Sequence, residues 1–217
     1  MKFIDASTKQ VNWKNRNYFF AGTILVILVN IILFATLGSG WCFEYRDTTA
    51  QWTDFSFVNF ISVMFAAFSH ADWGHVLLNM LSFAFVGFYT ERKYGTFGLL
   101  MFVLIFSFTA PAIASHIRGN IYHHGFSGIN YAFYAFVLID FILTFFDKNK
   151  KMSEIIVGII IVVAIYVNIS FTSVNDTLIF KAWPYDLVHN MAHYGGFFLG
   201  LIFGIIFHFF HKPDKNE

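Results

Sequence analysis

The fold is decided by the stretch GFSGINYAFYAFVLIDFILTFF, which occupies residues 125–146. From Ser127 onward this stretch offers 20 residues, of which Asp140 alone carries a charge. A helix that crosses a membrane needs roughly 20 predominantly apolar residues. The stretch therefore predicts a membrane-spanning helix that begins at a serine flanked by glycines.

Similar apolar segments lie on both sides of this one. With it included, the six predicted spans are residues 18–37, about 73–90, 97–115, 127–146, 155–171 and about 186–210. We therefore expect an all-α integral membrane protein, a bundle of six transmembrane helices that passes repeatedly through the cell membrane. The length suits one domain, residues 1–217, with its helical core in residues 18–210.

The composition supports lipid as the solvent. Hydrophobic residues make up 57% of the chain and charged residues 12%, whereas a typical soluble domain has about 25% charged residues. The net charge of +1 gives no reason to expect a nucleic-acid partner. Cys42 is the single cysteine, which excludes an internal disulfide and a cysteine-based metal cluster. The polar segment 1–17 lacks a small-residue cleavage pattern, so we interpret the first apolar run as a retained helix.

The positive charges predict the orientation of the six spans. Eleven of the lysines and arginines fall on one side of the predicted membrane and three on the other. Positive residues concentrate in cytoplasmic segments, so residues 1–17 and the tail, residues 211–217, are both expected in the cytoplasm. The loop 38–70 would then lie outside. Its aromatic residues suggest that it rests on or dips into the membrane interface, and a surface hairpin is the alternative.

Three groups of polar residues fall at membrane depth, where such residues are costly and often functional. His75 and Asn79 share one helix face, and alone they favour an ordinary interhelical hydrogen bond over a functional role. Ser127 starts its helix, where free backbone N–H groups can stabilise an oxyanion, although an ordinary N-cap serine is common. His193 has a side chain suited to general-base work, although it could also be a buried histidine bonded to a backbone carbonyl.

A stripe of small residues follows His193. Gly196, Gly200 and Gly204 repeat every four residues and offer a surface for close helix packing. A matching small surface on the 127–146 helix would comprise Gly128, Ala132 and Ala135. If the two helices pack there, Ser127 and His193 could come within hydrogen-bond reach.

The depths of these polar residues agree with one another. At about 1.5 Å per residue, Ser127 lies about 30 Å above the cytoplasmic charges, His193 about 28 Å and His75 about 24 Å. Tilt lowers each value but keeps the order. Three spans thus carry polar groups to similar heights in the outer half of the bilayer, which favours a shared catalytic site over scattered packing contacts.

These motifs, taken in order, resemble the rhomboid family of intramembrane serine proteases. The resemblance covers about residues 70–204. It rests on His75-x-x-x-Asn79, Glu91-x-x-x-Gly95, Gly125-Phe126-Ser127-Gly128 and Ala192-His193-x-x-Gly196-x-x-x-Gly200. The first outer loop departs from the family pattern, because Trp52 is followed by Thr53 where a Trp-Arg pair is common.

The resemblance implies a role for each matching residue. Ser127 would be the nucleophile and His193 its general base, while His75, Asn79 and the Ser127 backbone N–H would form the oxyanion hole. Tyr131 would hold the His193 ring. The supporting positions would be His70 at the water-accessible end of the site, the Glu91 region at the cytoplasmic turn, and the glycines Gly125, Gly128, Gly196 and Gly200. Substrates would be the transmembrane segments of other proteins, with membrane lipid as the surroundings and neither a cofactor nor a metal required.

The mechanism expected is that of a dyad. No carboxylate lies near His193 in sequence, and neither Asp140 nor Asp186 falls on the same turn. Burial would keep the imidazole neutral and ready to accept the serine proton. Water must also reach Ser127, and the polar segment 116–124 before it could admit water from outside.

Three other functions remain open. An inactive relative with the same fold would bind and retain membrane helices. A metal-dependent hydrolase or transporter could use His189 and His193, although no H-E-x-x-H motif or nearby carboxylate supports it. A channel or carrier would need polar residues down to the cytoplasmic face, whereas the polar groups noted above stop halfway.

Overall fold

The computed structural model describes residues 20–39, 64–118, 125–146, 152–176 and 186–210. In these ranges the chain forms helices and turns. The helices are α1 (Ala21–Leu37), α3 (Trp73–Arg118), α4 (Ser127–Phe146), α5 (Met152–Asp176) and α6 (Asp186–Phe210). The loop 38–70, expected to rest on the interface, and the segment 116–124, expected to admit water, lie largely outside the described residues, as do both termini.

Gly95 divides α3 into two helices. Its backbone adopts φ 76° and ψ 169°, a non-helical conformation that is open to glycine and strained for other residues. The two predicted spans 73–90 and 97–115 are therefore joined without a separate loop, because the chain stays helical up to this residue and resumes directly after it. We call the part before Gly95 the first half of α3.

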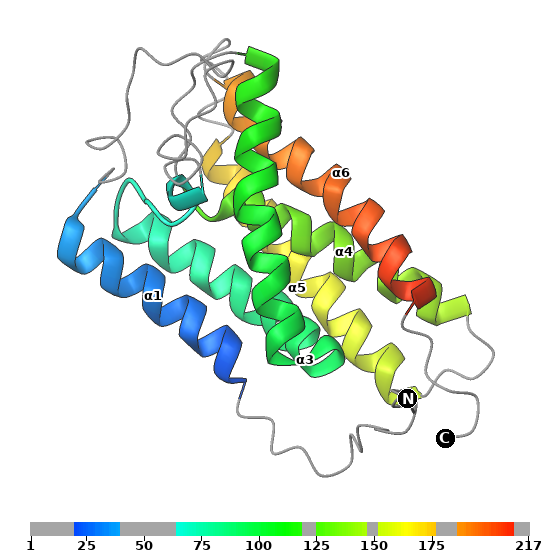
Figure 1. Cartoon of the computed structure of the whole chain (residues 1–217). Coiled ribbons are helices and arrows are strands. Elements are labelled where there is room, and N and C mark those ends of the chain that lie inside the picture. Colours follow the sequence, from blue (N-terminus) through cyan, green and yellow to red (C-terminus); the bar gives the residue numbers. More distant parts are fainter. Residues whose placement is uncertain (1–19, 40–63, 119–124, 147–151, 177–185, 211–217) are drawn as a thin grey trace, which may run out of the picture.

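The first half of α3, α4 and α6 run parallel to one another. Asn79 of α3 contacts Asn130 of α4, and Tyr89 of α3 contacts Asp140 of α4. Both pairs are separated by 51 positions, so the two helices run in the same direction. On the other face of α4, Gly196 and Gly200 of α6 approach the backbones of Gly128 and Ala132. Figure 1 shows α4 and α6 side by side. Residues near the start of all three helices consequently lie at one end of the bundle.

Phenylalanine fills the space between these helices. Phe83, Phe106, Phe133 and Phe136 are fully buried, and their rings meet one another or neighbouring aromatics edge to face. Such edge-to-face pairs add to the stability that burial alone supplies. The core between these helices is therefore largely aromatic.

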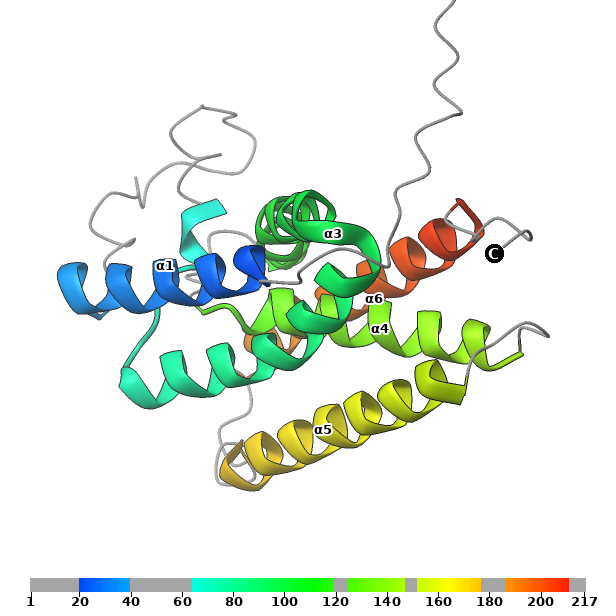
Figure 2. The same ribbon diagram turned by 90° about the horizontal axis from the view of Figure 1, so that it is seen from below.

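The remaining helices lie outside this core. α1 runs antiparallel to the first half of α3, with its start near Glu91 and Phe34 near its other end against Trp73. α5 lies at the edge of the bundle, where it contacts α4 and α3 (Figure 2). Both α1 and α5 expose large apolar side chains, among them Ile32 and Ile160.

Length and apolar composition together single out α4 as a helix able to cross a membrane on its own among the described residues. Three shorter apolar helical stretches accompany it, namely Ala21–Leu37, Met152–Val167 and His193–Phe209. The bounds of α4 and α6 agree with the predicted spans. The helix α5 extends past the predicted span at both ends, because a helix continues beyond the residues that are apolar.

Candidate active site

The start of α4 is held by contacts to the segment before α3. Gly125 has φ 107°, and its N–H donates to the carbonyl of Ala66 at 3.3 Å. The N–H of Phe126 donates to Nε2 of His70 at 3.4 Å. The His70 side chain is fully buried, and this contact ties it to the turn before Ser127. The role that the resemblance implies for His70, at the water-accessible end of the site, stays a prediction.

Ser127 and His193 meet at this end of the bundle. Oγ of Ser127 lies 2.8 Å from Nε2 of His193. In the neutral imidazole with its proton on Nδ1, the serine hydroxyl donates to Nε2. The His193 side chain is buried.

Tyr131 holds the imidazole from one side. Its ring stacks on that of His193, with 4.3 Å between the centroids and an interplanar angle of 6°. It is one turn beyond Ser127 on α4, so a single helix carries both the hydroxyl and the ring that supports its partner. This is the position expected from the sequence.

The helix α6 can approach α4 closely because glycine, which has no side chain, occupies the contact positions on α6. A Cβ atom at Gly196 or Gly200 would overlap the carbonyl oxygen of Gly128 or Ala132, respectively. Backbone atoms cannot move aside as a flexible side chain can. A Cβ atom at Gly204 would meet the Ile139 side chain and the backbone of Phe136. The third glycine of the stripe therefore packs against Phe136, and not against Ala135 as expected.

His75 and Asn79 converge on Gly125. A Cβ atom at Gly125 would lie 2.8 Å from Nε2 of His75 and 3.8 Å from Nδ2 of Asn79. The positive φ and this close approach both require glycine here. The His75 ring also meets His70 edge to face, with 5.1 Å between centroids. Two donor side chains from α3 thus lie beside the turn that carries Ser127.

One residue near these donors was missed by the sequence analysis. Asn130 is buried on α4, and its Nδ2 donates to the backbone carbonyl and to Oδ1 of Asn79, at 3.0 Å and 3.1 Å. An amide within an apolar span was the signal available, because such groups are costly there. We call Ser127, His193, Asn79, Asn130 and His75 the serine cluster.

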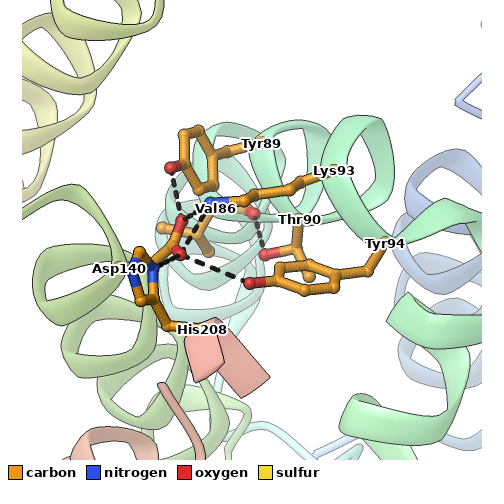
Figure 3. Close-up of polar contacts among 7 residues, drawn as sticks. All are labelled: Val86, Tyr89, Thr90, Lys93, Tyr94, Asp140 and His208. Atoms are coloured by element: carbon orange, nitrogen blue, oxygen red, sulfur yellow. Dashed lines mark hydrogen bonds and ion pairs between the residues drawn. The ribbon is translucent and has the colours of Figure 1, made fainter. Parts of the chain in front are cut away.

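A second buried polar group, the aspartate cluster, surrounds Asp140 farther along α4 (Figure 3). Tyr89 and Tyr94 donate their hydroxyls to the carboxylate at 2.7 Å and 3.4 Å, and Lys93 donates to both oxygens at 2.6 Å. His208 of α6 approaches it at 3.3 Å. Asp140 is thus engaged about 20 Å along α4 from Ser127, given 1.5 Å per residue.

Glu91 ties α1 to the turn within α3. Its carboxylate accepts from the N–H groups of Gly22 and Thr23 at 2.8 Å each, and from the Thr23 and Thr96 hydroxyls. A negative charge at a helix start offsets the unpaired N–H groups there. Burial alone would raise the pKa of Glu91, but these hydrogen bonds hold the pKa below its usual value.

The described residues contain no group of three or more histidine, cysteine, aspartate or glutamate side chains placed to hold a metal ion. The side chain of His189 lies outside the described residues, so a metal site formed by His189 and His193 stays untested. The chemistry the site offers rests on the serine hydroxyl, the imidazole and the nearby amide and imidazole donors.

The described residues thus form a helical bundle in which a serine and a histidine meet near the start of two central helices. The family model described as Rhomboid domain matches residues 57–210, more than half of the chain. The chain therefore belongs to the rhomboid family and is an integral membrane protein, either an intramembrane protease or an inactive relative of one. No match was found among curated proteins.

Proposed function

We propose that the protein is an intramembrane serine endopeptidase that hydrolyses peptide bonds in or near the transmembrane segments of other membrane proteins. The observation that carries the proposal is the 2.8 Å contact between Oγ of the partly buried Ser127 and Nε2 of the buried His193. A serine hydroxyl is a weak nucleophile until a base takes its proton. An inactive helix-binding relative has no need of that contact.

In the first half of the reaction, Ser127 attacks the carbonyl carbon of the scissile bond while His193 accepts the hydroxyl proton. The resulting oxyanion is stabilised by N–H donors that lie beside Gly125: Nδ2 of Asn79, the His75 ring and the backbone N–H of Ser127. Donors already in place cost little reorganisation as charge develops. His193 then gives its proton to the leaving amine, which leaves an acyl group on Ser127.

The second half repeats these roles with water. His193 accepts a proton from the attacking water, and the ester bond to Ser127 breaks as the proton passes back to the serine oxygen. Tyr131 keeps the ring in place through both halves by stacking. No carboxylate is assigned to the reaction, so the proposal is a Ser-His dyad, with orientation of the imidazole supplied by packing.

The proposed topology has six spans with both termini in the cytoplasm, and it follows from the distribution of positive charge. The site would then face the outer half of the bilayer, where a substrate helix can unwind near water. Reporters fused to either end would both have to remain on the cytoplasmic side.

The decisive experiment measures cleavage of a fluorescent transmembrane peptide by purified protein in detergent. Ser127→Ala should lower the rate at least about 10³-fold, as loss of a triad nucleophile does in soluble proteases. Ser107→Ala is the matched control, because Ser107 is also buried but bonds only to the nearby Leu104 carbonyl among the contacts described. It should retain activity.

The outcomes separate the alternatives. Cleavage by the wild type and by Ser107→Ala, but not by Ser127→Ala, supports the dyad. Equal cleavage by all three proteins would show that Ser127 is not the nucleophile. Absence of cleavage across a panel of peptides, with those peptides nevertheless bound, would favour the helix-binding relative. Activity that a strong chelator abolishes would favour a metal-dependent hydrolase.

A further inference from the structure

The orientation of the Asn79 amide is set by a neighbour. Asn130 follows Ser127 by three residues on α4 and is buried against the first half of α3. Its single amide nitrogen reaches two acceptors of one residue, the backbone carbonyl of Asn79 at 3.0 Å and the side-chain oxygen of Asn79 at 3.1 Å. Asn130 therefore contacts the oxyanion donor without lying in the reacting dyad.

The backbone carbonyl decides which way both amides face. A carbonyl oxygen can only accept a hydrogen bond, so the Asn130 atom that meets it must be nitrogen. The same nitrogen also meets the Asn79 side chain, and the Asn79 atom facing it must therefore be oxygen. The Asn79 nitrogen then faces the other way. Amide orientation is normally assigned from such networks, and this one admits a single assignment.

The Asn79 side-chain nitrogen, which faces away from Asn130, has no acceptor among the described residues. Nδ2 of Asn79 is buried and makes no hydrogen bond within the described part of the chain. It lies 3.8 Å from the place of a Cβ at Gly125, close to the turn that presents Ser127. A buried unmet donor costs free energy, and a developing oxyanion is the acceptor that would satisfy it.

We propose that Asn130 is a positioning residue for the oxyanion site: it fixes the Asn79 amide so that its N–H₂ group, and not its oxygen, faces the developing negative charge. This inference rests on the proposed protease function. Without Asn130, the Asn79 side chain can turn, and the reversed amide would present an oxygen that repels the oxyanion. Asn130 itself touches neither substrate nor reacting atoms.

The test replaces Asn130 by leucine, which has the same branched shape but no polar atoms. Asn130→Leu should lower kcat roughly 5- to 30-fold and change KM by less than about twofold. That loss is smaller than the 10²- to 10³-fold that follows removal of an oxyanion donor outright. Asn130→Asp keeps the shape but turns an acceptor toward Asn79, so it should lower kcat at least as much.

A double-mutant cycle distinguishes positioning from a structural role. In an Asn79→Ala background, Asn130→Leu should change kcat by less than about twofold, because there is no amide left to orient. An equal loss in both backgrounds would overturn the proposal, and so would full kcat in Asn130→Leu alone. Thermal unfolding in the same detergent identifies any variant that fails to fold.

Asn30 provides a matched control on α1. Like Asn130 it is buried and donates through Nδ2 to a backbone carbonyl, that of Val26 at 2.9 Å. In both residues Oδ1 has no hydrogen-bond partner within the described ranges. Asn30→Leu should leave kcat within about twofold of the wild type. A loss equal to that of Asn130→Leu would assign the effect to removal of any buried amide.

An inactive wild type would sink the proposed function and still leave the orientation testable. The side-chain amide resonances of Asn79, identified by their loss in Asn79→Ala, should shift in Asn130→Leu and keep their positions in Asn30→Leu. Unchanged resonances in Asn130→Leu would overturn the positioning role whether or not the protein cleaves peptides.

Discussion

The serine cluster and the aspartate cluster lie on the same three helices but treat their polar groups in opposite ways. Around Asp140, both carboxylate oxygens receive hydrogen bonds from tyrosine and lysine side chains. Around Ser127, the Asn79 side-chain nitrogen has no hydrogen-bond partner among the residues that the structure describes. A fully satisfied buried network stabilises one packing of the core, whereas a donor held open is ready for charge that appears during a reaction. The contrast separates the polar group expected to stabilise the bundle from the one proposed to react.

Two histidines on α6 give the sharpest way to break this comparison. His193→Ala should abolish peptide cleavage, with a loss of at least about 10³-fold, because the serine loses its base. His208→Ala removes the contact to Asp140 and should keep most of the activity while lowering the unfolding temperature. Cleavage rates and thermal unfolding measured on both variants check this. The reverse pattern, with His208 needed for cleavage and His193 dispensable, would end the distinction.

Removing the Asp140 carboxylate should have the largest effect on the free energy of unfolding. Asp140→Leu leaves Lys93 without its partner, and breaking a buried pair costs about 3–5 kcal/mol. The lower end is expected, because the Lys93 side chain keeps 31% exposure and can reach water. Unfolding in detergent measures the loss. The double variant Lys93→Met/Asp140→Leu should recover part of it, and failure to recover any would show that the tyrosines matter more than the ion pair.

The spacing of α4 and α6 should respond to a single methyl group. Gly200→Ala places a Cβ against the Ala132 carbonyl, and overpacking of this kind costs about 1–3 kcal/mol. Because the helices must separate, the Ser127–His193 contact lengthens and cleavage should fall roughly tenfold or more. Ile202→Phe is the control, since Ile202 is exposed on the same helix. Loss of stability with unchanged cleavage would uncouple the glycines from the site.

The stacked tyrosine should have the smallest effect. Tyr131→Phe keeps the ring on His193 and should retain activity within about twofold. Tyr131→Leu removes the ring, and the loss of an aromatic pair, about 1 kcal/mol, corresponds to roughly a fivefold fall in kcat. Cleavage assays on the two variants measure the difference. A large loss in Tyr131→Phe would point instead to a role for the hydroxyl.

Much of the arrangement could be predicted from the sequence. The family was recognised from short motifs, and the family match confirms it. The apolar runs placed α4 and α6 well, and the glycine stripe predicted that they pack together. The catalytic roles of Ser127 and His193 stay predictions, although the two side chains do meet. These successes share a cause, because each pattern is local along one helix.

What the sequence did not supply depends on contacts between helices. Asn130 could not be singled out from the sequence, because its hydrogen-bond partner Asn79 is 51 positions earlier in the chain. From the sequence, Asp140 could be related only to His193. Its hydrogen-bond partners come from two other helices, α3 and α6. Gly95 fell within a polar stretch that looked like a loop, whereas the chain remains helical on both sides of it.

The contact between α6 and α4 sets the distance between the Ser127 and His193 side chains through main-chain atoms. Main-chain positions change little when side chains elsewhere are replaced. The exposed isoleucine, leucine and valine residues of α1 and α5 take no part in that contact. Replacing them should therefore suit the protein to bilayers of different thickness or lipid content while the distance between Ser127 and His193 stays the same.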